Sequence, residues 1–193
     1  FSQIAHFQIV DELFGDREQQ LKAIPRKTRA VLRTAERSGL TYELSCTDLA
    51  PFVDLYSQSL RNLGTPMFPS KRFEASLDAF ADADILTVRQ CGRIIGCVLN
   101  YYYKETMLPF FAGALPEARD GGGNNYLYWA MLESGYDRGY RTFDFGRSKA
   151  GTGAYEFKRH FGMEPVKLAY QYDLVHCDEL PNVNPTNPKY AKV

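Results

Sequence analysis

Apolar residues recur at helical spacing near the start of the chain, and the first clear case is the segment 21–37. Its pattern predicts one helix with an apolar face and an opposite arginine face. The apolar face carries Ile24, Val31 and Ala35, and the arginine face carries Arg26, Arg29, Arg33 and Arg37. Gly39 then provides a stop signal, and 41–44 is typical of a short strand.

A second apolar stripe predicts a helix over about 48–63, in which Pro51 is compatible with the first turn. The stripe consists of Leu49, Phe52, Val53, Tyr56, Leu60 and Leu63. The segment 62–69 contains one glycine and two prolines and is therefore expected to be a loop. Ser70 is expected to cap a short helix after this loop. That helix carries Phe73, Leu77 and Phe80.

The middle of the chain is typical of consecutive antiparallel hairpins. Strands are predicted over 84–89, 94–103 and 106–114. The sequence Gln-Cys-Gly-Arg at 90–93 indicates the first hairpin turn, and Lys-Glu at 104–105 indicates the second. Pro109 lies within the third strand, so we expect either an edge position or a bulge there.

The last third of the chain begins with a glycine loop at 119–123 that leads into a helix over about 124–138. Leu127, Met131 and Leu132 are expected to face inward, and Gly139 to end the helix. After it the pattern predicts a strand over 140–146, a short helix over 151–160 and a final alternating strand over 166–174.

This order of elements predicts the α/β (α+β) fold class, with a mostly antiparallel central sheet flanked by helices. We expect three parts: an N-terminal segment with the basic helix over 1–40, the main domain over 41–176, and an irregular tail over 177–193. The chain begins with Phe rather than Met, and we expect residues to be missing upstream.

Composition limits the possible classes of function more than it limits the possible folds. The chain has 23 basic and 23 acidic residues, so no net charge draws it to nucleic acid as its main partner. No apolar run reaches the length of a membrane span, and no signal peptide is visible. The cysteines show no metal-ligand spacing, and we expect free thiols and no metal site. They are Cys46, Cys91, Cys97 and Cys177.

Chemistry is first suggested by the segment Arg-Asp-Gly-Gly-Gly-Asn at 119–124, which joins a strand to a helix. Backbone N–H groups of a glycine turn and a helix N-terminus suit a diphosphate or another anion. Arg119, Gly121, Gly122, Gly123 and Asn124 are therefore candidate cofactor-binding residues. A flexible loop with an asparagine helix cap is the alternative.

A second candidate region follows the strand that ends near Gly146, where two cations, two hydroxyls and three glycines gather in 146–153. Cations at the end of a strand suit an anionic or developing oxyanion centre. Asp144 is expected to pair with Arg147 and hold it in place, and this pairing could equally serve only to brace a turn.

The third candidate region is the short helix over 151–160. Tyr155 and Lys158 share one face of it at i, i+3 spacing. Tyr155 could donate a proton to a leaving group, and Lys158 could stabilise a tetrahedral oxyanion. A solvated Lys158 beside core phenylalanines is the alternative, and His160 is expected to be structural.

Four segments resemble the FemAB-like proteins associated with PEP-CTERM and exosortase systems, which belong to the GNAT acyltransferase superfamily. The segments are Ile-Pro-Arg-Lys-Thr-Arg at 24–29, Arg-Asn-Leu-Gly-Thr-Pro at 61–66, Phe-Asp-Phe-Gly-Arg-Ser with Gly-Thr-Gly at 143–153, and Phe-Lys with Phe-Gly at 157–162. The glycine turn also matches the GNAT coenzyme A signature at Arg119 and Gly122, whereas Asn124 replaces its final small residue. Fem-type proteins have two GNAT-like halves, and this chain looks like the second.

The resemblance implies a GNAT-like acyl-CoA N-acyltransferase fold and several functional residues. Lys158 is implied near the acyl-transfer centre, and Arg29 or Arg33 is implied to meet a substrate phosphate. Asn62 and Thr65, in the second matching segment, are the further substrate-binding candidates. The genomic association implies work on the cell envelope or on exopolysaccharide, in the cytoplasm or at the inner face of the membrane.

The leading hypothesis is a bacterial N-acyltransferase that moves an acyl or aminoacyl group to an amine. Its donor could be acyl-coenzyme A as a co-substrate, with no tightly bound cofactor, or an aminoacyl-tRNA. The alternative is a non-catalytic GNAT-like module that binds an envelope glycan or a protein partner. Tyr101, Tyr102 and Tyr103 would suit sugar stacking, although alternation requires at least one to point inward.

Overall fold

The computed structural model describes residues 4–9, 16–45, 49–80, 82–163, 165–168, 173, 175 and 176. Within them, seven strands form one sheet in the order β2-β3-β4-β5-β6-β1-β7. The strands are β1 (Ile4–Ile9), β2 (Leu40–Ser45), β3 (Ala83–Gln90), β4 (Arg93–Tyr103), β5 (Thr106–Ala114), β6 (Thr142–Lys149) and β7 (Pro165–Lys167). The helices are α1 (Arg17–Ala23), α2 (Arg26–Arg37), α3 (Leu49–Asn62), α4 (Ser70–Ala79), α5 (Glu117–Asp120), α6 (Gly123–Asp137) and α7 (Gly153–Arg159). The expected mixed α/β class with a mostly antiparallel sheet is confirmed.

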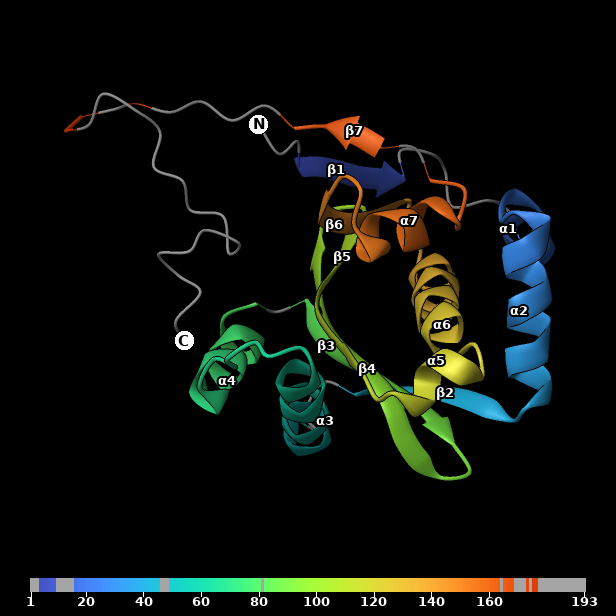
Figure 1. The fold of residues 1–193 in the computed structure, drawn as a ribbon, viewed down its shortest axis with the longest axis horizontal. Coiled ribbons are helices and arrows are strands. Elements are labelled where there is room, and N and C mark those ends of the chain that lie inside the picture. The colour runs from blue at the N-terminus through green and yellow to red at the C-terminus, as the bar shows by residue number, and fades with distance from the viewer. Residues whose placement is uncertain are drawn as a thin grey trace.

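Helices cover both faces of this sheet (Figure 1). On one face, which we call the α3 face, α3 and α4 pack over a cluster that includes Phe52, Phe73, Ile85, Leu99 and Phe111. On the other, the α6 face, α6 lies between the sheet and α2 over a cluster that includes Leu32, Leu86, Val98, Trp129 and Phe143. Because α6 is enclosed from both sides, it is apolar around most of its circumference.

The two predicted hairpin turns are confirmed. Cys91 and Gly92 both have positive φ, at 50° and 81°, which suits the two-residue turn between β3 and β4. Within β5, a register shift falls where Asn100 pairs with Pro109. Pro109 therefore lies at a bulge. On its other side β5 is paired with β6 only at Thr106 and Met107, so Pro109 also lies where that side of the strand is open.

The contact between β5 and β6 is parallel and short. Only Thr106 with Thr142 and Met107 with Phe143 are in register. From Leu108 onward, β5 has no paired partner among the described residues of β6, although it stays paired with β4 to its end. The two strands therefore separate toward their carboxyl ends, as they do in the ribbon of Figure 1.

The single helix predicted over 21–37 is wrong. The chain forms α1 and α2, which are separated at Ile24 and Pro25. Proline lacks the N–H of an interior helical residue and favours an extended residue before it, and Ile24 has φ −75° and ψ 136°. Arg29 then donates to the carbonyl oxygens of Leu21 and Lys22, at 3.3 and 3.2 Å, and so caps the end of α1.

The predicted faces of this region need one correction. Ile24 and Ala35 are buried as expected, whereas Val31 is 38% exposed and Leu32 takes the inward position. Beside them, Arg17 of α1 contacts Glu36 of α2 and Glu133 of α6, and its guanidinium lies 5.5 Å from the centre of the Trp129 ring. These contacts join α1 and α2 to α6.

The ends of several other helices and strands also differ from those predicted by the sequence pattern. Ser70 is the first residue of α4 rather than its cap, a position that Pro69 occupies without a side-chain bond. The four-residue helix α5 was not predicted. Strand β6 begins at Thr142 and continues to Lys149, because its last residues pair with β1, a strand that the sequence did not reveal. The described part of the final strand is limited to β7, and residues 169–172, 174 and the tail over 177–193 lie outside the described residues.

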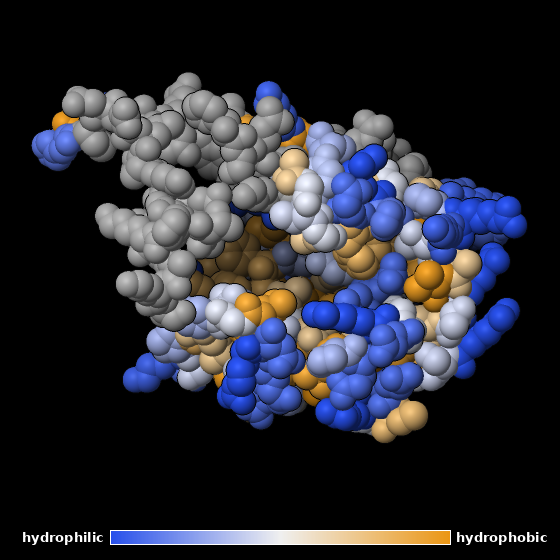
Figure 2. Space-filling model, in the orientation of Figure 1, coloured by the Kyte–Doolittle hydropathy of each residue, from blue (hydrophilic) through white to orange (hydrophobic). Residues whose placement is uncertain are grey.

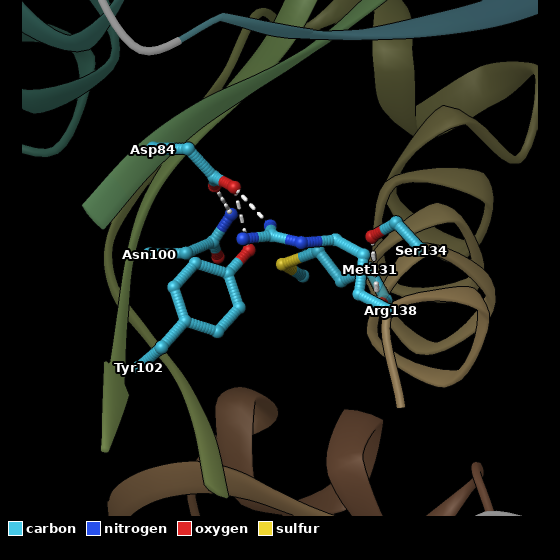
Figure 3. Close-up of polar contacts among 6 residues, drawn as sticks. All are labelled: Asp84, Asn100, Tyr102, Met131, Ser134 and Arg138. Atoms are coloured by element: carbon cyan, nitrogen blue, oxygen red, sulfur yellow. Dashed lines mark hydrogen bonds and ion pairs between the residues drawn. The ribbon is translucent and has the colours of Figure 1, made fainter. Parts of the chain in front are cut away.

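A buried polar cluster fixes the carboxyl end of α6 to the sheet (Figure 3). Asp84, at the start of β3, is 3% exposed and accepts hydrogen bonds from Asn100 Nδ2 at 2.9 Å and Tyr102 OH at 2.8 Å. Arg138, directly after α6, pairs with the same carboxylate and lies over the Tyr102 ring, 4.3 Å from its centre. Tyr140 stacks on Tyr102 at 4.6 Å between ring centres.

Two further observations bear on the composition. Cys91 and Cys97 are free thiols, the first exposed and the second buried, while Cys46 and Cys177 lie outside the described residues. Among the helices described, none combines the length and apolar character that a bilayer crossing demands.

Candidate functional site

Lys158 is the buried cation of the candidate site. It lies on α7 and is 8% exposed, and its Nζ donates to the carbonyl oxygen of Phe145 on β6 at 2.5 Å. Burial lowers the pKa of Lys158 from its ordinary 10.5 to about 8, and the Asp144 carboxylate raises this pKa in part. An ammonium group near its pKa at neutral pH can stabilise a nearby oxyanion and can also exchange a proton.

A bulge in β6 presents the carbonyl group to Lys158. The pairing with β1 shifts register between His6 and Gln8, which places the extra residue of β6 near Phe145 and Gly146. Gly146 has φ 66°, a conformation that glycine adopts without strain. Its N–H donates to Asp144 Oδ1 at 2.8 Å, so the carboxylate supports the bulge.

Arg147 differs from its predicted setting. It was expected in a loop, but it lies in β6, in register with His6, and it is exposed. The Asp144 carboxylate, which was expected to brace Arg147, accepts a hydrogen bond from the backbone of Gly146. Arg147 therefore has an exposed side chain on a strand, one residue beyond the bulge.

Tyr155 shares α7 with Lys158, as the spacing predicts. It is half-buried against the cluster of the α6 face, and its N–H bonds the Thr152 hydroxyl at 3.3 Å in the helix cap. Its ring lies 5.9 Å from the Arg159 guanidinium. His160 is exposed, and its backbone carbonyl accepts from the Thr28 hydroxyl, in keeping with a structural position.

Aromatic rings surround the bond between α7 and β6. Tyr128 of α6 stacks on Phe145 at 4.9 Å between ring centres, with Phe157 and Phe161 of the α7 segment beside it. Burial raises the pKa of Tyr128 to about 12, so its hydroxyl stays neutral at physiological pH. Sequence reasoning missed Tyr128, because a tyrosine within an apolar helix has no signal that separates it from the core.

The three glycines of the turn before α6 have different surroundings. Gly122 has φ 74°, and a Cβ there would lie 2.8 Å from Val31 Cγ1, while a Cβ on Gly123 would lie 3.0 Å from Ala118. Gly121 has open space around it. Gly122 and Gly123 are thus required by conformation and by close packing, and of the three only Gly121 has free space where a side chain would lie. Arg119 is exposed and Asn124 is half-buried.

The glycine turn and Lys158 lie at different positions along the region in which β5 and β6 diverge. The paired residues Met107 and Phe143 mark its closed end, and Lys158 binds the carbonyl of Phe145 two residues further along β6. The far end of β5 leads through α5 to the turn and the amino end of α6. First-turn N–H groups of a helix lack intrahelical partners and favour an anion.

The predicted substrate-binding residues lie apart from this region. Asn62 ends α3 and Thr65 follows in the loop to α4, and both are exposed. On α2, Arg33 is exposed, whereas the Arg29 guanidinium caps α1. The structure therefore brings Lys158 and Asp144 together and places Tyr155 one turn away on the helix of Lys158. It leaves the glycine turn, the α2 arginines and the α3–α4 loop as separate surfaces.

The structure is thus a mixed α/β domain in which β5 and β6 diverge, with a glycine turn after β5 and a buried lysine beside β6. The model of the acetyltransferase (GNAT) domain family matches residues 22–159, and the chain belongs to this family. It is thus an acyltransferase domain. No curated protein matches the chain by sequence.

Solved structures share its fold. FemX superposes with a TM-score of 0.74 at 15% identity, over 86% of this chain and 60% of FemX. The C-terminal domain of a putative lysylphosphatidylglycerol synthetase from Agrobacterium fabrum gives 0.64 at 15% identity, over 86% and 59%. AAC(6')-Iy in complex with a coenzyme A bisubstrate analogue gives 0.56 at 17% identity, over 72% and 99%. The chain therefore spans about three fifths of the first two.

Proposed function

We propose that this domain transfers an acyl or aminoacyl group from an activated donor to an amine on a cell-envelope or exopolysaccharide-related acceptor. The observation that carries the proposal is Lys158, a buried cation held by the Phe145 carbonyl beside the separation of β5 and β6. A buried charge with one fixed partner is costly to keep, and such groups gather at functional sites.

In this reaction the amine nitrogen attacks the donor carbonyl, and negative charge develops on the carbonyl oxygen. The Lys158 ammonium stabilises that charge in a site enclosed by aromatic rings. The tetrahedral intermediate then collapses, the bond to the donor's leaving group breaks, and Tyr155 supplies the proton that this group takes up. The attacking nitrogen loses its proton to solvent.

Two donors fit the surfaces described. Acyl-coenzyme A is favoured by the open side of Gly121, by exposed Arg119 and by the amino end of α6, and a fold neighbour binds a coenzyme A analogue. An aminoacyl-tRNA is favoured by the likeness to FemX and by exposed arginines of α2 such as Arg33. Arg33 suits a phosphate better than Arg29, whose guanidinium caps α1.

The α3 face supports the acceptor side of the proposal. Figure 2 shows a hollow with hydrophobic residues on its floor, above α3 and α4 as they lie in Figure 1. Phe68, Phe80 and Phe110 are each about half exposed on this face, and Phe80 and Phe110 both contact Tyr101. Exposed rings next to the polar loop of Asn62 and Thr65 suit a sugar-bearing acceptor.

The envelope acceptor itself, and a site of action at the cytoplasmic side of the membrane, rest on the FemAB-like resemblance. Because the chain spans about three fifths of FemX, we propose that a second half completes the acceptor cleft. Of the three tyrosines expected to stack on sugars, Tyr102 is buried, Tyr101 is half-buried and Tyr103 is 73% exposed, as alternation requires.

The test is a transfer assay with radiolabelled acetyl-coenzyme A and aminoacyl-tRNA as donors and amino sugars or lysyl peptides as acceptors. Lys158→Met should lower the rate about 100-fold, because it removes the charge and keeps the bulk. Lys104→Met changes an exposed turn lysine and should leave the rate unchanged. Equal rates for Lys158→Met and the unmodified chain would exclude Lys158 from the reaction.

A further inference from the structure

Asp144, beside the bulge in β6, influences Lys158 in two ways: through the backbone and through its charge. Asp144 Oδ1 accepts the Gly146 N–H, and the residue between them, Phe145, provides the carbonyl oxygen that binds Lys158. The backbone segment that fixes Lys158 is therefore itself held by Asp144. The carboxylate also lies close enough to Lys158 for its charge to favour the ammonium form.

The other ionisable groups near α7 are less suited to this role. Glu156 and Arg159 are exposed on α7 and pair with each other at 3.4 Å. Tyr128 of α6 remains neutral because burial raises its pKa to about 12. On the same strand as Asp144, Arg147 is exposed. Tyr155 completes the set on α7.

We propose, resting on the function proposed above, that Asp144 is the positioning residue of the site: it holds the bulge that fixes Lys158 and keeps that lysine charged. Burial alone favours a neutral amine at Lys158, which could not stabilise an oxyanion. The Asp144 carboxylate opposes this tendency, because its negative charge favours the ammonium form. Asp144 thus acts on Lys158 both through the backbone of the bulge and through its charge.

This arrangement determines in which direction the Lys158 pKa should move when the Asp144 charge is removed. Burial lowers the pKa of Lys158 to about 8, and Asp144 acts in the opposite direction. Removing the negative charge should lower the pKa further, so the ammonium form would be lost at a lower pH. An activity that requires this ammonium should then decline at a lower pH as well.

Two substitutions separate the structural from the electrostatic part. Asp144→Asn keeps an oxygen that can accept the Gly146 N–H and removes the charge, whereas Asp144→Ala removes both. Glu156→Gln removes an exposed carboxylate from the same helix as Lys158 and serves as the control. The charge state of Lys158 is followed by NMR titration of lysine ¹³Cε resonances, assigned through the signal missing in Lys158→Met.

Asp144→Asn should lower the Lys158 midpoint by about one pH unit, and Glu156→Gln should leave it within about 0.2 unit. In the transfer assay, the alkaline limb of the pH–rate profile should move by the same amount. An unchanged midpoint in Asp144→Asn, or an equal shift in Glu156→Gln, would overturn the proposal even where transfer is observed. Because the titration needs no substrate, it decides this inference independently of the proposed function.

Discussion

At the residue scale, Gly121 and Gly122 show that neighbouring glycines of one motif can have different structural roles. Gly122 has φ 74° and lies against Val31 of α2, so a side chain is opposed both by the backbone conformation and by lack of space. Gly121 has φ −95° and no atom within 4 Å of a Cβ. A match to the coenzyme A signature at Gly122 therefore has a packing explanation that is independent of any ligand.

The first prediction concerns this pair. Gly122→Ala should destabilise the fold by about 1–3 kcal/mol, because alanine is strained in the left-handed region and its Cβ would lie 2.8 Å from Val31 Cγ1. Gly121→Ala should change stability by less than about 0.5 kcal/mol. Urea denaturation of both variants measures the difference.

A second substitution isolates the steric part of this cost. Adding Val31→Ala to Gly122→Ala should recover part of the loss, since the nearest atom would be gone. Equal stability of the two single glycine variants would contradict the assigned packing. For ligand tests at this turn, Gly121→Ala with Arg119→Ala is the suitable variant because it leaves the contact with α2 intact.

The sequence indicated Lys158 and Tyr155, because charged and phenolic side chains at a spacing of three stand out on a short helix. It could not indicate the partner of Lys158, which is a backbone carbonyl and carries no residue-type signal. The bulge that orients this carbonyl depends on pairing with β1, about 140 positions away in the chain. Local patterns contain no information about such a partner.

At the element scale, the predictions succeeded where local signals decide the structure. The third hairpin strand was predicted over 106–114, as observed for β5, because the turn at 104–105 fixes where it begins. The same reasoning failed at Pro25, where an amphipathic pattern continues across a break in the backbone hydrogen bonding. It also missed β1, although Ala5, Phe7 and Ile9 alternate with His6 and Gln8 there.

The attachment of α6 to the sheet gives the next prediction. Arg138→Met should destabilise the fold by about 3 kcal/mol, because it leaves the buried Asp84 carboxylate without its cation. Asn100 and Tyr102 would still donate to this carboxylate, so unfolding should remain a single cooperative transition. Guanidinium denaturation followed by tryptophan fluorescence reports on it through Trp129 of the same helix.

An exposed ion pair nearby offers the matched control. Arg141 lies 3.7 Å from Glu105, and both side chains are about two thirds exposed. Arg141→Met should therefore cost less than about 0.5 kcal/mol. Similar losses for the two arginine variants would show that burial of Asp84 does not determine the strength of the attachment.

At the scale of the whole molecule, the two ends of the described chain meet at one side of the sheet. β1, near the amino end, lies between β6 and β7 and is bonded to both. The strand that carries Asp144 and Phe145 thus depends on residues that precede the family match at 22–159. The origin of 1–40 as part of a preceding half-domain stays a prediction, but β1 belongs to the same sheet as β2–β6, and α2 packs into the same core as α6.

This dependence gives the last prediction. Deletion of residues 1–9 should expose the edge of β6 and leave β7 without its partner. We expect thermal unfolding about 5 °C lower or more, with self-association through the exposed edge detected by light scattering. The deletion should also perturb the Lys158 ¹³Cε resonance, because the bulge at Phe145 and Gly146 forms against β1. An unchanged melting temperature together with an unchanged Lys158 resonance would mean that β6 holds its bulge alone, and that the site is built entirely within the family-matched segment.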